Sequence, residues 1–285
     1  MRLDRPIGTW LLLLPALWSI MLAIGMTSQT LTQTFIQTLA QTLTLIVLFS
    51  LGAVVMRGAG CVINDLWDQD LDSQVERTKT RPLASGVISR KQAFVFLAML
   101  LSIRFCILIQ LPALTIGLGF VSLGFVVLYP LMKRITWWPQ AFLGLTFNFG
   151  ALMGGSAVTG TLTLSSILLY IGGIFWTLGY DTIYACQDKE DDALVGIKST
   201  ARLFGTNTKR WIAGFYVMTT LCFLGAVFVV YPDWRVALCL PAFLIFVFQI
   251  KAFEIDDPQN CLKQFKQHRN FGLTYLVGIC MCQSL

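Results

Sequence analysis

Long apolar runs separated by short polar segments dominate the chain. Nine of these runs approach the length of about 20 residues that an α-helix needs to cross a bilayer. They lie near residues 9–27, 40–62, 92–110, 112–131, 138–158, 164–184, 211–231, 234–251 and 270–284. Helices are favoured because a transmembrane barrel strand shows only about ten residues of alternating polarity. The pattern predicts an all-α integral membrane protein with about nine transmembrane helices in a single domain over residues 1–285.

Composition agrees with this interpretation. Hydrophobic residues make up 56% of the chain and charged residues 13%, whereas a soluble domain carries about 25% charged residues. In the nine-helix topology the loop Lys and Arg residues fall on one side, and only Arg235 falls on the other. Because Lys- and Arg-rich loops stay in the cytoplasm, the N-terminus is expected inside and the C-terminus outside. The net charge of +6 therefore needs no nucleic-acid partner.

The chain shows no recognisable cleavable signal and no Arg- and Ser-rich transit peptide. We therefore expect a multi-pass protein of a bacterial inner membrane, with a cytoplasmic N-terminus and a periplasmic C-terminus. The eight cysteines form no CxxC pair and lie mostly in apolar runs. Their expected role is that of small buried hydrophobic side chains.

A first acidic segment, NDLWDQDLD at residues 64–72, follows the second apolar run. If the helix continues through it, Asn64, Asp68 and Asp72 recur every four residues, and Asp65 lies on the same face. Asp70 points elsewhere and is interpreted as a solvated acid. Like charges at this spacing destabilise a helix by a few tenths of a kcal/mol per pair, so a bound cation would favour the arrangement.

A second acidic segment, DKEDD at residues 188–192, follows the sixth run. On a continuous helix Tyr184 and Asp181 precede Asp188 by four and seven residues, and Asp191 or Asp192 extends the same face. Asp181 lies inside the apolar run, where an ionisable side chain is costly and marks a site. The alternative is that both segments are solvated loop acids, but two dense groups at helix ends of equal depth speak against it.

Carboxylate oxygens suit Mg²⁺ or Ca²⁺, and no glycine occupies the turn position of a calcium loop. Mg²⁺ typically shares its coordination shell with substrate phosphates, so two facing acidic segments would hold Mg²⁺ around a diphosphate. Basic residues near both segments would complete such a pocket. Arg104 has no acidic partner in the pattern and is interpreted as snorkelling or as a helix contact.

Several motifs resemble those of a known family. NDxxDxxxD at residues 64–72 and YDTxYAxxDxxDD at 180–192 are similar to the UbiA superfamily of intramembrane prenyltransferases. RLDRPIGTW at 2–10, RPLxSG at 81–86 and GIKSTA at 196–201 resemble its 4-hydroxybenzoate branch. The resemblance implies nine helices around a central cavity that opens to the cytoplasmic side. It also implies Mg²⁺-dependent transfer of a polyprenyl group from polyprenyl diphosphate to the ring of 4-hydroxybenzoate, ortho to the hydroxyl, in ubiquinone biosynthesis.

The same resemblance assigns roles to individual residues. The expected ligands of Mg²⁺ and diphosphate are Asn64, Asp65, Asp68, Asp72, Asp188 and Asp192, and the catalytic base is Asp188 or Asp191. The basic groups expected at the diphosphate are Arg57, Arg77, Lys79 and Lys133. Arg5 and Arg134 are alternatives for the acceptor carboxylate, because a guanidinium binds a carboxylate in bidentate geometry. Asp181, Tyr180 and Tyr184 are expected to line the cavity.

Two other functions share part of this pattern. A prenyltransferase with another acceptor, such as naphthoate, homogentisate, haem or a tetrapyrrole, would carry the same acidic segments. An ion-coupled transporter would place its acids near the membrane midplane on broken helices, whereas these lie at helix ends. The sequence predicts neither the prenyl length, the oligomeric state, the number of metal ions nor any protein partner.

Overall fold

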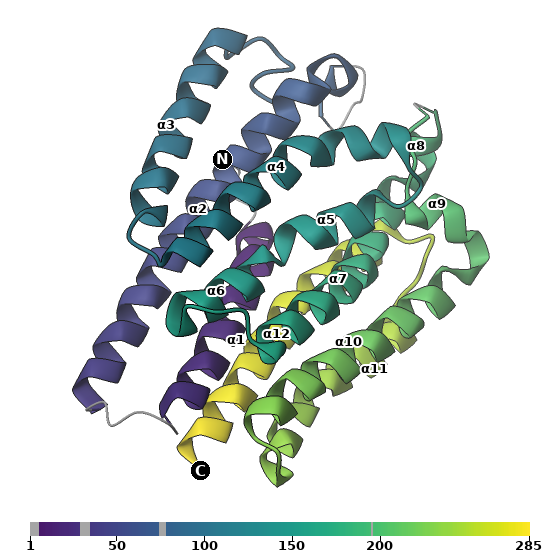
Figure 1. Cartoon of the computed structure of the whole chain (residues 1–285). Helices are drawn as coiled ribbons and strands as arrows, with labels where there is room; N and C mark the ends of the chain where they lie inside the picture. Colours follow the sequence, from purple (N-terminus) through teal and green to yellow (C-terminus); the bar gives the residue numbers. More distant parts are fainter. Residues whose placement is uncertain (1–5, 29–34, 74–77, 195) are drawn as a thin grey trace.

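The computed structural model describes residues 6–28, 35–73, 78–194 and 196–285. The described part is helical throughout its regular elements (Figure 1). The α-helices are α1 (Ile7–Ser28), α2 (Phe35–Asp72), α3 (Arg90–Leu108), α4 (Ala113–Ile135), α5 (Pro139–Phe147), α6 (Phe149–Thr159), α7 (Leu164–Ala185), α8 (Lys189–Leu194), α9 (Thr200–Phe204), α10 (Thr208–Val230), α11 (Leu240–Ala252) and α12 (Pro258–Ser284). Short 3₁₀ helices span Cys186–Asp188, Gly205–Asn207 and Trp234–Cys239.

Nine long helical rods can be counted in the described residues when α5 and α6 are taken together, which confirms the predicted fold class. Eight helical segments of that part are long and apolar enough to cross a membrane. The ninth rod, α12, falls short of this measure because it begins at Pro258, before the predicted apolar run, and its first half is polar. Asp257 caps its start by accepting hydrogen bonds from the N–H groups of Gln259 and Asn260.

The rods alternate in direction, so the charged loops gather at one end of the bundle. We define the charged face as this end, formed by residues 78–89, 136–138, 186–194, 196–199 and 253–257. In Figure 1 the short helices α8 and α9 lie at this end, and the C-terminus lies at the other. The helix α2 runs through the predicted first acidic segment without a break and ends at Asp72, as the four-residue spacing requires.

The predicted fifth span is interrupted at Asn148, which separates α5 from α6. The buried Asn148 side chain donates hydrogen bonds to the carbonyl of Gly144 (2.8 Å) and to the hydroxyl of Thr177 on α7 (2.9 Å). Gly173 makes room for it, since a Cβ there would lie 2.2 Å from the Asn148 Oδ1. A polar contact between helices therefore replaces a regular turn at this position.

The core lies between α1, α7, α10 and α12 and is centred on Trp18. The Trp18 ring packs against those of Trp176, Phe223 and Tyr275, with centroids 5.1–5.3 Å apart. Its indole N–H donates to the Gly272 carbonyl at 2.9 Å, so the buried polar atom is satisfied. The helices α2, α3 and α4 instead carry many exposed apolar side chains, as expected for surfaces that face lipid. This asymmetry leaves room for a cavity between α2, α4 and the core.

Candidate functional site

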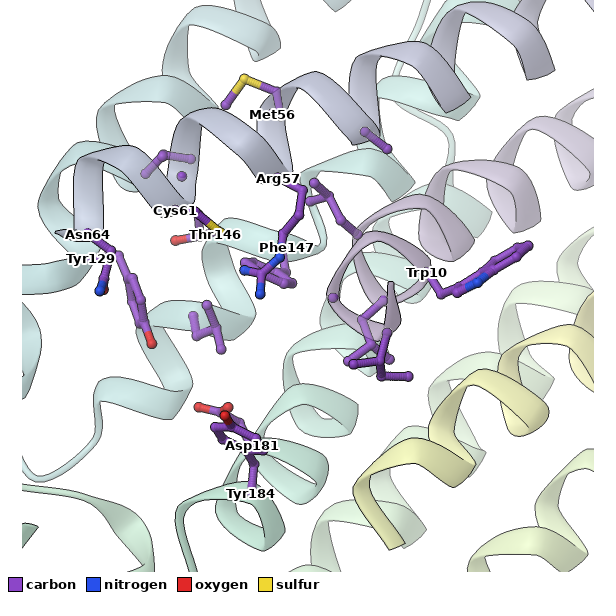
Figure 2. Close-up of a pocket in the computed structure, with 18 of the residues that line it drawn as sticks. Trp10, Met56, Arg57, Cys61, Asn64, Tyr129, Thr146, Phe147, Asp181 and Tyr184 are labelled. Atoms are coloured by element: carbon purple, nitrogen blue, oxygen red, sulfur yellow. The ribbon is translucent and has the colours of Figure 1, made fainter. Parts of the chain in front are cut away.

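A cavity of about 1090 Å³ lies between α1, α2, α4, α5, α6, α7 and α12. The polarity of the lining side chains changes along the cavity. Acidic and basic side chains line the end near the charged face, and apolar side chains such as Leu48, Phe49, Leu111 and Met153 line the rest. Figure 2 shows side chains from opposite walls directed into this space, among them Arg57 and Asp181. One cavity therefore joins a charged mouth to an apolar interior.

The first acidic segment contributes Asn64 and Asp68 to the cavity wall. Asp68 is only 9% exposed, so its carboxylate has little access to bulk water. Asp65, on the same helix face, instead forms an ion pair with Arg81 at 3.3 Å, and Arg81 itself lines the cavity. The backbone of Asp72 ends α2, but its side chain lies outside the described part, so its role as a ligand stays a prediction.

The second acidic segment contributes Asp188 to the cavity wall, and Asp181 and Tyr184 of the preceding helix α7 line the same wall. Figure 2 shows Asp181 and Tyr184 on one side of the cavity, with Asn64 and Tyr129 on another. The structure thus brings members of both acidic segments to one cavity, as the resemblance implied. Because Asp181 belongs to a membrane-spanning helix, its carboxylate lies deeper than the Asp188 carboxylate at the helix end.

One local prediction is wrong: the second acidic segment does not continue α7 as a single α-helix. The helix α7 ends at Ala185, a 3₁₀ helix covers Cys186–Asp188, and α8 then begins at Lys189. A 3₁₀ turn has 3.0 residues per turn rather than 3.6, so the four-residue spacing of an α-helix does not hold through Cys186–Asp188. The side chains of Asp191 and Asp192 lie outside the described part, and their roles stay predictions.

Tyr180 differs from Asp181 and Tyr184 because its side chain is almost fully buried. It borders the cavity, but its side chain is buried at 1% exposure. Its hydroxyl accepts a hydrogen bond from Thr177 at 3.1 Å, and its ring packs edge-on against Trp176. These contacts fix the Tyr180 side chain within the packed wall of the cavity.

Among the predicted basic residues, Arg57 reaches deepest into the cavity wall. Its guanidinium lies against Gly8 of α1, where no side chain intervenes. The buried Nε of Arg57 has no hydrogen-bond partner among the described residues. A buried N–H group without a partner is costly. Because Arg57 also lines the cavity, the remaining N–H groups of its guanidinium are the ones placed to meet an anion there.

Lys133 and Arg134, at the end of α4, also line the cavity. The Lys133 ammonium lies over the Tyr129 ring, 5.8 Å from its centroid. The Arg134 guanidinium is 3.6 Å from the Asp68 carboxylate and donates to the Trp67 carbonyl at 3.2 Å. This pairing holds Arg134 beside the first acidic segment, within reach of the same anion.

Other predicted cations are not placed at the cavity. Lys79 is exposed and is not part of the cavity wall, and Arg5 and Arg77 lie outside the described residues. Arg81, one of the basic residues expected near the first acidic segment, does line the cavity. Sequence reasoning gave no site role to three further lining cations, namely Lys198, Lys266 and Arg269. Lys198 and Arg81 occur in the motifs quoted above, and Lys266 and Arg269 are three apart on α12, which places them on one face.

Arg104 is a helix contact and not a snorkelling side chain. Its Nη2 donates to the Gly119 carbonyl (3.3 Å) and to the Ser122 hydroxyl (3.1 Å) of α4. Side chains on a helix lean toward its N-terminus, so Arg104 reaches inward along α3 and not toward the nearer end. This contact joins α3 to α4 at the cavity wall.

The donor set at the mouth fits Mg²⁺ that is shared with a phosphate. In the part of the chain that the structure describes, no three Cys, His, Asp or Glu side chains form a metal-binding group by themselves. The cavity does present oxygen donors from Asn64, Asp68 and Asp188, which are the hard ligands that Mg²⁺ prefers. Since Mg²⁺ typically takes one or two protein carboxylates and completes its shell with water and phosphate, these residues fit it.

Several curated proteins with similar sequences carry the name "4-hydroxybenzoate polyprenyltransferase, mitochondrial". The protein of Drosophila pseudoobscura pseudoobscura is 47% identical, and the match covers 99% of this chain and 68% of that protein. The Homo sapiens protein is 46% identical, with 99% and 73% covered. The Arabidopsis thaliana protein is 44% identical, with 99% and 67% covered.

The predicted location in a bacterial inner membrane is wrong, because these relatives are named as mitochondrial proteins of eukaryotes. The predicted cytoplasmic and periplasmic sides are wrong for the same reason. A multi-pass membrane protein is still supported by the helical segments of the described residues that are long and apolar enough to cross a membrane. The physical reason is that loop charges report which side of a membrane a loop faces. They carry no information about which membrane it is.

Solved structures agree on the fold. A UbiA homologue from Aeropyrum pernix K1 superposes with a TM-score of 0.73 at 21% identity, covering 98% of this chain and 97% of that one. A UbiA homologue from Archaeoglobus fulgidus bound to GPP and Mg²⁺ gives 0.62 at 18% identity, covering 100% and 99%. The model of the UbiA prenyltransferase family matches residues 12–273. With most of its length matched by the family model and nearly all of it by the curated relatives, the chain belongs to the UbiA prenyltransferase family.

Proposed function

We propose that this protein transfers a polyprenyl group from polyprenyl diphosphate to the ring of 4-hydroxybenzoate, ortho to the hydroxyl, in ubiquinone biosynthesis. The observation that carries the proposal is the single cavity in which both acidic segments and a set of cations meet an apolar interior. Such a cavity suits a substrate with a diphosphate head and a long hydrocarbon tail. The shared name of relatives that are 44–47% identical over 99% of the chain supports the acceptor.

The diphosphate is proposed to bind at the charged mouth, between Asn64 and Asp68 on one wall and Asp188 on another. Bound Mg²⁺ would neutralise the negative charge that develops on the leaving diphosphate. Lys133 and Arg134 add positive charge beside Asp68, so part of this stabilisation comes from fixed side chains. The prenyl tail would lie along the apolar wall or continue into lipid.

The acceptor needs a cation for its carboxylate and a base for the proton that leaves the ring. Arg134 remains a candidate for the carboxylate, although its contact with Asp68 also suits the diphosphate. Arg57, proposed at the diphosphate, lines the same cavity and is a second candidate for the carboxylate. Asp188 and Asp191 stay the proposed alternatives for the base. Allylic charge released in the cavity would be held near aromatic faces such as that of Tyr184.

The test is product formation by protein purified in detergent, with geranyl diphosphate and 4-hydroxybenzoate. We expect a prenylated hydroxybenzoate whose formation stops with EDTA and returns with excess Mg²⁺. Prenylation of naphthoate or homogentisate in its place would contradict the acceptor and keep the reaction class. Binding of geranyl diphosphate with Mg²⁺ but no transfer to any aromatic acceptor would contradict the reaction. Activity in detergent also separates an enzyme from a transporter, which needs two compartments.

A further inference from the structure

Residues 197–202, here called the strap, are fastened on two sides by hydrogen bonds. The Lys198 N–H donates to the Lys133 carbonyl at 3.1 Å, and the Lys198 ammonium donates to the Ile135 carbonyl at 3.2 Å. The Thr200 N–H donates to the Gln140 Oε1 at 3.1 Å. On the other side, the hydroxyls of Thr200 and Thr182 of α7 are 2.6 Å apart. The strap thus joins the α4–α5 junction (residues 133–140) to α7.

The α4–α5 junction also contacts the first acidic segment. Arg134 of this junction pairs with Asp68 and donates to the Trp67 carbonyl. Both the junction and the strap border the cavity. A continuous path of contacts therefore runs from the first acidic segment through the junction and the strap to α7, which leads directly into Asp188.

The hydrogen bond between Gln140 and Thr200 is a buried link of this path. Gln140 is 4% exposed and Thr200 is fully buried. Thr200 is the first residue of α9, after the capping residue Ser199, and the first N–H groups of a helix have no partner within it. Removing the Gln140 oxygen would leave this N–H buried and unsatisfied, which costs more than the net value of the bond.

We propose that Gln140 is a positioning residue, which holds the strap on the α4–α5 junction and so keeps the second acidic segment in place opposite the first. This inference rests on the proposed function, because it assigns the two segments to one diphosphate. Gln140 acts through Thr200 and not by contact with the reacting atoms. Its loss should therefore impair binding of the diphosphate with Mg²⁺ more than binding of the aromatic acceptor.

Four variants isolate the hydrogen bond. Gln140→Met removes the acceptor at similar length, and Gln140→Glu keeps an acceptor oxygen. Thr200→Pro removes the donor, and the fold tolerates proline there, because it is the first helical position and Ser199 before it is extended (φ −152°, ψ 158°). Thr200→Ser is the matched control, since it keeps both the N–H that meets Gln140 and the hydroxyl that meets Thr182.

Two measurements are made without turnover: the affinity for geranyl diphosphate with Mg²⁺, and hydrogen exchange over residues 196–207 in metal-free protein. We expect Gln140→Met and Thr200→Pro each to weaken the affinity roughly fivefold and to speed exchange. Gln140→Glu and Thr200→Ser should stay within about twofold of the unmodified protein, and the double variant Gln140→Met/Thr200→Pro should be no weaker than either single one. The KM for 4-hydroxybenzoate should change by less than about twofold.

Unchanged diphosphate affinity with faster exchange would overturn the proposal, because the strap would then serve stability alone. A rise in the acceptor KM with normal diphosphate affinity would also overturn it, since Gln140 would then contact the acceptor. Failure of the proposed function is distinguishable: the unmodified protein would bind geranyl diphosphate with Mg²⁺ but prenylate no hydroxybenzoate. The binding and exchange results would still decide the role of Gln140.

Discussion

Replacing Gly8 by alanine should displace the Arg57 guanidinium while leaving the fold intact. A Cβ at Gly8 would lie 2.5 Å from the Arg57 Nε, 2.7 Å from Cζ and 2.8 Å from Nη2, whereas ordinary contact begins at 3.4 Å. The guanidinium must therefore move by about 0.9 Å, and a displacement of about 1 Å at a binding group can lower a rate about a hundredfold. The obstructing atoms are the end of a flexible side chain, and alanine is the best helix former.

The assay is steady-state kinetics with geranyl diphosphate and 4-hydroxybenzoate, beside thermal unfolding in detergent. We expect Gly8→Ala to lower kcat/KM by roughly tenfold to a hundredfold with little change in melting temperature. Arg57→Met supplies the reference. If Gly8→Ala acts through Arg57, it should add almost nothing in the Arg57→Met background. Normal kinetics for Gly8→Ala, or an equal further loss in that background, would refute the reasoning.

Three further outcomes are expected. Gly154→Ala brings a Cβ within 2.5 Å of a backbone carbonyl of α1, so thermal unfolding should show a loss of about 1–3 kcal/mol; unchanged stability would mean that α1 and α6 can separate freely. Asp68→Asn should lower kcat/KM by at least about a hundredfold, whereas the matched change at the exposed Asp70, Asp70→Asn, should leave it near normal; equal effects would contradict the assignment of Asp68. Hydrogen bonds from Arg235 hold the pKa of Asp233 below its usual value. The pair therefore stabilises the folded state at pH values above the usual pKa of an aspartate. This stabilisation is lost as the pH falls through the lowered pKa of Asp233 in the folded protein. The stability difference between the unmodified protein and Asp233→Asn should therefore be present at neutral pH and shrink in acid; a difference independent of pH would contradict it.

The sequence alone determined eight of the nine predicted stretches as long and apolar enough to cross a membrane, because the transfer of apolar side chains into lipid depends on local composition. It also determined that α2 carries Asn64 and Asp68 on one face, since a four-residue spacing repeats on any α-helix. The acidic and basic motifs were sufficient to identify the UbiA prenyltransferase family, to which the chain belongs. Each of these properties depends on residues that are close together in the chain, or on a recognisable sequence motif.

Only the tertiary structure decided which of these residues meet. Asp65 pairs with Arg81, and Arg134 pairs with Asp68, through contacts between segments that no local spacing encodes. The break at Asn148 depends on Thr177 of another helix, so the apolar run alone reads as one uninterrupted span. The bond between Gln140 and Thr200 joins residues sixty positions apart, because helices packed side by side bring distant parts of the chain into contact.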